Sequence, residues 1–283
     1  MKKNSLYALL LLIIAMFSGQ GSGSLAKVLF QNFPVLTVAA MRLFFSVIIL
    51  AFIFRIWTIN FRKIRWKAIF SYGLALAGMN ALFYLSLERL PLGLAVAFEF
   101  TGPLCIALYY IRKKYDFLWV ACAILGLILL LPLNQTTSDL DLIGVLFGIG
   151  AGGCWAIYIL AGQKESGISG NHTVCLGMSI GMFCLLPFAF FSGAMSRVIE
   201  LPNLYYFIGL AVLASALPFS LEMVALRRLT SRSFGTLMSL EPAIAALSGF
   251  IFLGETLLWT QWLALVAIII ASIGCTFTVQ QYK

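Results

Sequence analysis

The chain has 283 residues, of which 62% are apolar and 10% are charged. Soluble domains carry about 25% charged residues, so this composition excludes an ordinary soluble enzyme, a disordered chain and a nucleic-acid-binding module. In so apolar a chain, the net charge of +9 is first of all an indication of how the protein is oriented in a membrane. Apolar stretches long enough to cross a bilayer as helices, about 20 residues each, recur along the whole length.

The apolar stretches predict ten transmembrane helices joined by short loops, and hence an all-α integral membrane protein. A cleavable signal peptide is the alternative for the first stretch, because two lysines precede the apolar run from Leu6 to Phe17. The internal repeat described below favours a helix there. In chain order the expected spans are residues 5–30, 35–54, 66–87, 92–111, 116–133, 141–161, 172–192, 203–226, 232–253 and 259–279.

The basic residues fall almost entirely on one side of these spans. With the N-terminus in the cytoplasm, 15 of the 19 Lys and Arg residues lie inside, and only Arg89 and Arg197 lie outside. Lys27 and Arg42 fall within spans. This bias is a strong positive-inside signal, and it predicts that both termini are cytoplasmic.

Parts of the two halves of the chain match each other after a shift of 139 residues, which places Pro103 on Pro242. We therefore interpret residues 1–138 and 139–283 as two repeats of five spans each. Because five is an odd number, the repeats lie in the membrane with opposite orientation. Inverted repeats of this kind are typical of secondary transporters, which bind substrate near the membrane midplane.

Particular motifs resemble a known family. Phe234–Thr256 contains a Glu-Pro pair and a Gly-Glu before the final helix, and it resembles the last repeat of the EamA family in the drug/metabolite transporter superfamily. Leu90–Pro103 resembles the same pattern in the first half. Asp116, which the shift places on Glu255, departs conservatively from a family pattern that often has Glu. The resemblance covers essentially the whole chain and implies a ten-helix secondary transporter working by alternating access.

Three stretches are similar to the family members that export threonine and homoserine across the bacterial inner membrane: Gly78–Tyr84, Ala97–Pro103 and Gly152–Tyr158. The similarity implies small neutral amino acids as substrates, and we expect proton antiport to drive export. Export of another metabolite or an amphiphilic drug is the main alternative. A membrane-embedded enzyme and a channel are two others. The sequence lacks a second convergent acid/base or metal cluster, which speaks against the enzyme.

Charged side chains at bilayer depth are costly, about 2.5 kcal/mol or more on insertion scales, so each is a candidate functional group. Glu99 and Glu241 occupy nearly equivalent places in the two repeats, and Pro103 and Pro242 each free a backbone carbonyl nearby. Each half therefore offers acceptor groups suited to an ammonium group or a proton, with Glu241 our first choice as the proton-coupling residue and Glu99 the second. The charged residues predicted at bilayer depth are Lys27, Arg42, Glu99, Glu222 and Glu241.

Structural roles compete with these functional ones. Glu99 and Glu241 could instead form ion pairs with Arg42 or Lys27 that hold helices together. Lys27 is also long enough to extend its ammonium group to the membrane interface, and Glu222 lies near the cytoplasmic end of its span.

Five polar or aromatic residues complete the expected substrate site: Gln20, Asn80, Tyr84, Trp155 and Tyr158. Gln20 lies in residues 18–24, a run without apolar side chains that is either an unwound cavity wall or a close-packing helix face. Glycines at 144, 148 and 152 favour packing through their four-residue spacing. Asn80 and Tyr84 share a helix face, and ordinary core packing is the alternative for the aromatic residues. With the two acids, this set suits a small zwitterion.

No other chemistry is indicated by the sequence. The six cysteines lie inside apolar runs without a Cys-x-x-Cys pair, so we interpret them as packing residues. With a single histidine, His172, and no nucleotide-binding motif, we expect no metal site, no cofactor and no ATP-driven pump. The expected partners are the amino-acid substrate, protons and the lipid bilayer, with no nucleic acid and no obligatory protein partner.

Overall fold

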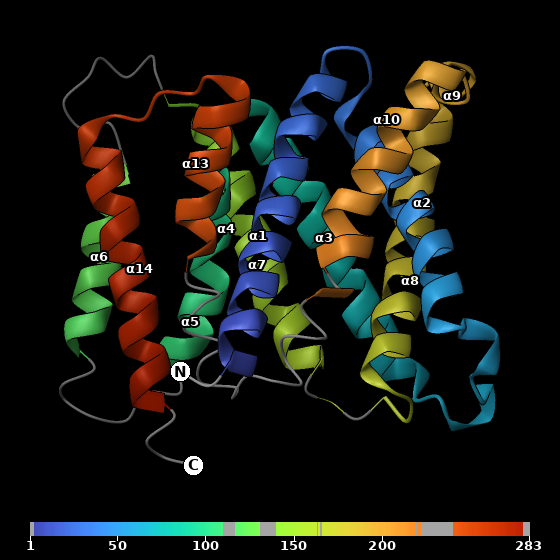
Figure 1. Ribbon diagram of the computed structural model, residues 1–283, viewed down its shortest axis with the longest axis horizontal. Coiled ribbons are helices and arrows are strands. Elements are labelled where there is room, and N and C mark those ends of the chain that lie inside the picture. The colour runs from blue at the N-terminus through green and yellow to red at the C-terminus, as the bar shows by residue number, and fades with distance from the viewer. Residues whose placement is uncertain are drawn as a thin grey trace.

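The computed structural model of the chain is a bundle of helices that lie side by side (Figure 1). It describes residues 3–109, 117–130, 140–162, 164, 166–218, 220–221 and 240–279. Within these ranges the regular secondary structure is helical and no strand occurs, which confirms the all-α fold class.

The helices lie where the apolar stretches predict them, with two differences. The expected span 92–111 is interrupted at Phe100, and within span 232–253 the helix begins at Glu241, after a turn at Leu240. Residues 219 and 222–226 of span 203–226 and residues 232–239 lie outside the described residues. The first half contains α1 (Lys3–Phe30), α2 (Val35–Phe54), α3 (Trp66–Arg89), α4 (Leu92–Glu99), α5 (Thr101–Tyr109) and α6 (Phe117–Leu130). The second half contains α7 (Leu142–Gly162), α8 (Gly170–Phe191), α9 (Met195–Val198), α10 (Leu201–Ala211) with a π-helical turn after it (Val212–Ala216), α13 (Glu241–Leu253) and α14 (Trp259–Val279).

The outer surface of the bundle is apolar. Phe183, Phe191 and Leu146 are each more than half exposed, as expected for side chains that face lipid rather than water. Five helical stretches among the described residues are long and apolar enough to cross a membrane: Leu10–Phe30, Val35–Phe54, Trp66–Arg89, Leu142–Gly162 and Gly170–Phe191. Shorter apolar helices cover Leu92–Ile106, Leu201–Ala216, Glu241–Leu253 and Trp259–Ala271.

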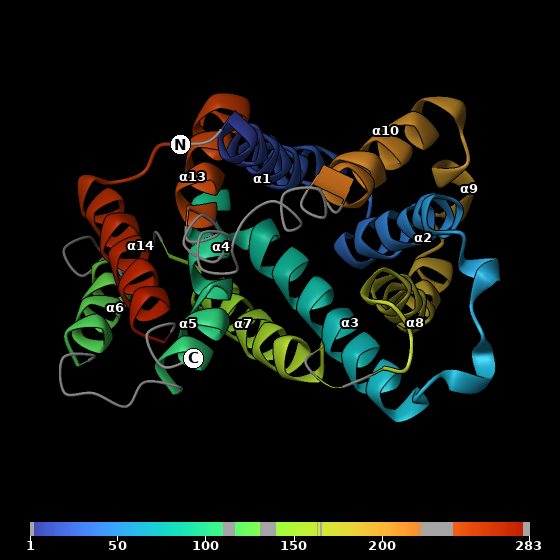
Figure 2. The same cartoon turned by 60° about the horizontal axis from the view of Figure 1, so that its bottom comes forward.

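Helices from the two halves of the sequence are interleaved. On one side of the bundle α2 packs along α8, and α3 packs against both α7 and α8 (Figure 2). On the other side α6 packs along α14, and α4 packs against α13. Buried side chains from both halves join in one continuous core, so the halves do not form separate lobes.

Glycines bring α7 into close contact with its neighbours. A Cβ atom added to Gly144 would lie 2.9 Å from α3, and one added to Gly148 would lie 2.8 Å from Phe98 of α4. A Cβ atom added to Gly102 of α5 would lie 1.8 Å from the carbonyl oxygen of Gly152. The packing role that the four-residue glycine spacing predicts is therefore confirmed.

The polar run at residues 18–24 is helical throughout, so of the two alternatives left open by the sequence the structure supports a closely packed helix face and not an unwound segment. Ser18 Oγ donates to the carbonyl oxygen of Leu213 at 2.8 Å, in the π-helical turn. A Cβ atom added to Gly23 would lie 2.7 Å from the Leu92 side chain. The small residues allow α1 to approach α4 and the π-helical turn closely.

Two ion pairs of the described chain join segments far apart in sequence. Lys27 Nζ lies 2.5 Å from Glu255 Oε1, and Glu255 Oε2 accepts the backbone N–H of Leu92 at 2.7 Å. That N–H opens α4 and has no partner within the helix, so Glu255 caps α4. The structural role that the sequence allowed for Lys27 is therefore an ion pair with Glu255, in the loop after α13.

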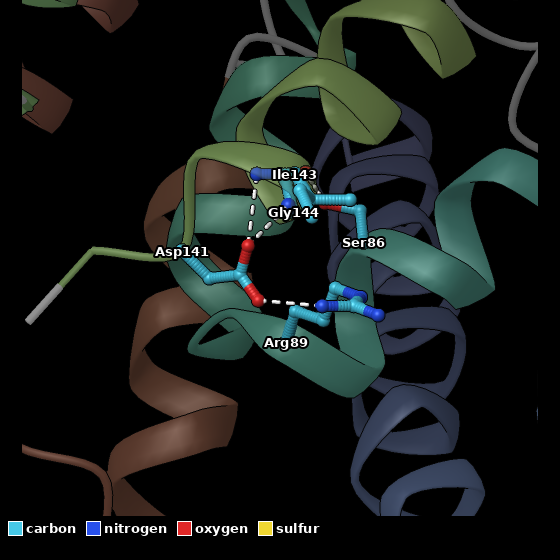
Figure 3. A network of polar contacts seen from close by, with 5 residues as sticks. All are labelled: Ser86, Arg89, Asp141, Ile143 and Gly144. Carbon is cyan, nitrogen blue, oxygen red and sulfur yellow. Dashed lines mark hydrogen bonds and ion pairs between the residues drawn. The ribbon is translucent and has the colours of Figure 1, made fainter.

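The second ion pair closes the junction between α3 and α7 (Figure 3). Arg89 Nη1 donates to Asp141 Oδ2 at 2.7 Å, and Asp141 Oδ1 accepts the backbone N–H groups of Ile143 and Gly144. Ser86 Oγ donates to the Gly144 carbonyl at 2.8 Å. Hydrogen bonds from side chains therefore join the end of α3 to the start of α7.

We expect Gly152→Ala to lower the melting temperature of the purified protein, because its Cβ atom would lie 2.6 Å from the backbone oxygen of Glu99. Overpacking of this kind costs about 1–3 kcal/mol. Gly153→Ala is the matched control, since a Cβ atom there meets nothing within 4 Å. The measurement is thermal unfolding in detergent. Equal melting temperatures for the two variants would show that the α7 contact is not tight.

Candidate functional site

A cavity of about 180 Å³ lies among α1, α3, the end of α4, the start of α13 and the π-helical turn. This volume equals roughly six molecules of liquid water at about 30 Å³ each, so the cavity suits a small solute. Its wall combines small and apolar residues with six polar or charged side chains that matter below: Gln20, Arg42, Asn80, Tyr84, Glu99 and Glu241.

The structure brings five of the seven predicted site residues to this cavity: Gln20, Asn80, Tyr84, Glu99 and Glu241. Trp155 and Tyr158 do not line it. Trp155 packs edge-on against Phe100, with ring centroids 5.8 Å apart. The Tyr158 hydroxyl lies 2.6 Å from that of Tyr72, in the wall of a separate cavity near Lys164. The glycine face of α7 packs against α3, α4 and α5. Trp155 and Tyr158, which follow these glycines in α7, therefore lie away from the central cavity.

Glu99 is the last residue of α4 and is buried, with 9% of its surface exposed. The helix breaks just after it because Pro103 has no N–H group to bond the Glu99 carbonyl oxygen. The Thr101 hydroxyl bonds the Phe98 carbonyl oxygen at 2.6 Å, and α5 begins at Thr101. The break places the Glu99 carboxyl in the cavity wall.

Glu241 is the first residue of α13 and is followed by Pro242. Its carboxyl therefore lies in the first helical turn, where the helix macrodipole favours negative charge. Under the 139-residue shift, Leu240, where the chain turns into α13, falls on Thr101, next to the break at Phe100. Both halves thus place an acid beside a helix end.

Arg42 also lines the cavity, although the sequence placed it only among the charges at bilayer depth. Its guanidinium carbon lies 5.2 Å from the centroid of the Tyr84 ring. The Nε atom is buried and has no hydrogen-bond partner within the described chain. The predicted alternative of an ion pair between Arg42 and Glu99 does not occur among the described residues.

Several lining residues carry no signal in the sequence. Met79, Phe83 and Pro218 contribute apolar wall to the cavity, and an apolar side chain beside a cavity has the same sequence pattern as one in the core. Glu222, the remaining charge predicted at bilayer depth, lies outside the described residues.

Comparison with known proteins identifies relatives over nearly the whole chain. The threonine/homoserine exporter RhtA of Salmonella typhimurium (strain SL1344) is 49% identical over 276 residues, which cover 96% of this chain and 92% of that protein. RhtA of Escherichia coli (strain K12) is 48% identical over 277 residues, with the same coverage. An uncharacterized transporter of Archaeoglobus fulgidus is 26% identical over 229 residues, which cover 80% of this chain and 81% of that protein.

A solved crystal structure shares the fold, with a TM-score of 0.59 over 96% of each chain at 15% identity. The family model described as the EamA-like transporter family matches residues 142–277. The relatives named above are transporters rather than enzymes, and the apolar helices are those of a multi-pass membrane protein. The chain therefore belongs to the EamA-like transporter family.

Proposed function

We propose that this protein exports small neutral amino acids of the threonine and homoserine type from the cytoplasm, in exchange for protons. The observation that carries the proposal is the 49% identity, over 96% of the chain, to an exporter named for these substrates. The central cavity of about 180 Å³ supports it, because it is small and has acidic, basic and amide groups in its wall. A zwitterion requires such a mixture.

The architecture that we propose is ten transmembrane helices in two inverted five-helix repeats, residues 1–138 and 139–283. The five long apolar helices, the four shorter ones and α6 at the expected span 116–133 support this number. The break at Phe100 and the turn at Leu240 recur at nearly the same place in the two halves, which supports the repeat.

The distribution of basic residues supports two cytoplasmic termini in the inner membrane. Helix α1 begins and α14 ends at the same end of the bundle, where the basic loop between α2 and α3 also lies (Figure 1). The Arg65 N–H bonds the Ser166 carbonyl oxygen at 2.9 Å, so the loop carrying Lys164 joins this basic end. Arg197, in α9, lies at the opposite end (Figure 1). Basic loops remain in the cytoplasm.

Exchange follows from competition at a carboxyl group. A carboxyl that binds either a proton or the substrate ammonium, but not both, moves them in opposite directions when access to the cavity alternates between the two sides. Glu99 and Glu241 both line the cavity, and they belong to different repeats. Alternating access would expose this shared cavity first to the cytoplasm and then to the periplasm.

Export of a more amphiphilic metabolite is the second candidate, because Met79, Phe83 and Pro218 make part of the wall apolar. Sites for drug-sized ligands enclose about 300–1,000 Å³. The smaller central cavity therefore favours an amino acid over a drug.

The first prediction concerns topology. Reporter fusions after Lys114 and after Lys283 are expected to be cytoplasmic, and one after Gln135 periplasmic, because basic loops stay inside. These three positions lie outside the described residues. Phosphatase and fluorescent-protein activities of the fusions measure their location. A periplasmic C-terminus would rule out ten spans and with them the inverted repeat.

The second prediction concerns substrate. Cells that overproduce the protein are expected to grow at toxic external concentrations of threonine or homoserine that inhibit cells with an empty vector. Growth curves and efflux of the radiolabelled amino acids from loaded cells provide the measurement. Unchanged tolerance to both amino acids, with new resistance to a drug, would favour the second candidate.

The third prediction concerns the two acids. Glutamine keeps the volume and one acceptor of glutamate but cannot exchange a proton. Glu99→Gln and Glu241→Gln are expected to leave the protein folded, and at least one should abolish transport driven by a pH gradient while keeping downhill exchange. Proteoliposomes with and without an imposed gradient provide the measurement, and Glu88→Gln is the control at an exposed acid.

Two outcomes would contradict a role in proton coupling. Stable variants with normal gradient-driven transport would exclude both acids. If both variants instead melted early, the acids would be structural partners, since removing one member of a buried pair costs about 3–5 kcal/mol.

A further inference from the structure

Two side chains of opposite charge, Arg42 and Glu99, line the central cavity without a direct ion pair between them among the described residues. Arg42 comes from α2 and Glu99 from the end of α4. Glu99 also has no hydrogen bond to the described chain, although it is buried with 9% of its surface exposed. A buried charge is normally paired or hydrogen-bonded, and the described residues supply no such partner to either group. A bound ligand could supply one to each.

Arg42 is held by an aromatic contact and lines the central cavity. Its guanidinium lies over the Tyr84 ring, 5.2 Å from the ring centroid, and Tyr84 is itself fixed by an edge-on contact with Phe30. The buried Nε donor has no acceptor within the described chain. A planar guanidinium held in this way presents a fork of N–H groups, which matches the two oxygens of a carboxylate.

Asn80 also lines the cavity, and one of its amide hydrogens is already bonded within the protein. Its Nδ2 donates to the Leu76 carbonyl oxygen at 2.7 Å, one turn earlier in α3. This bond fixes the orientation of the amide and leaves its Oδ1 atom as an acceptor for a ligand. A hydroxyl group of a ligand could donate to it.

We infer that Arg42 binds the α-carboxylate of the substrate and that Glu99 binds its α-ammonium group. The inference rests on the proposed function and goes beyond it, because it assigns the two ends of the amino acid to two charged residues. Substrates then need both charged groups, and Arg42 determines specificity by excluding amines that lack a carboxylate.

The experiment measures equilibrium binding to the purified full-length protein in detergent, by titration calorimetry. The ligands are threonine, and threoninamide, which keeps the ammonium and hydroxyl groups but lacks the carboxylate. The proteins are the wild type, Arg42→Met and Arg42→Lys. Arg197→Met is the matched control, because Arg197 also lies over an aromatic ring, that of Phe33, but outside the cavity.

Wild-type protein and Arg197→Met are expected to bind threonine at least tenfold more tightly than threoninamide. Arg42→Met should lose about tenfold to a hundredfold in threonine affinity, the size expected for charge-assisted hydrogen bonds, and should bind the two ligands equally. Arg42→Lys should retain part of the preference, because an ammonium keeps the charge but not the fork.

The possible failures are distinguishable. If the wild type does not bind threonine, the proposed function is contradicted. If it binds threonine and threoninamide equally, or if Arg42→Met keeps the preference for threonine, the assignment of Arg42 is overturned while the proposed function stands. Should Arg42→Met not fold, the wild-type comparison and Arg42→Lys decide the matter, and an unchanged preference in Arg42→Lys counts against a bidentate contact.

Discussion

The close crossing of α5 and α7 is the contact on which the arrangement of the central cavity depends. At Gly102 and Gly152 the two backbones leave no space for a side chain, and Pro103, next to the crossing, has no N–H group to bond the Glu99 carbonyl oxygen. Helix α4 therefore stops inside the bundle at Glu99 instead of running through it. A continuous helix would leave no helix end at this depth, and the acid would then be one more charge on a helix face.

The described charges illustrate how such a bundle tolerates ionised groups. Lys27 and Arg89 are each paired with a carboxylate that also accepts backbone N–H groups at the start of a helix. Each carboxylate thereby serves two needs, the neutralisation of a cation and the capping of a helix. Arg42 has neither kind of partner within the described chain, which sets it apart from the structural cations.

Much of the fold could be predicted from the sequence, because a helix that crosses lipid needs a long apolar run, and such runs are visible directly. The site could be predicted only in part. Asn80 and Tyr84 share the face of α3 that lines the cavity, whereas Trp155 continues the glycine face of α7 and so contacts Phe100. The partner of Lys27 lies 228 residues away, and no local pattern indicates a contact of that range.

The capping of α4 by Glu255 has a consequence for the order of assembly during synthesis. The first N–H group of α4 meets its acceptor 163 residues further along the chain, and the same carboxylate neutralises Lys27 of α1. A nascent chain that has inserted only its first half therefore holds an uncapped short helix and an uncompensated lysine. Neither is satisfied until the loop after α13 emerges from the ribosome. These two contacts are therefore completed only when both halves are present.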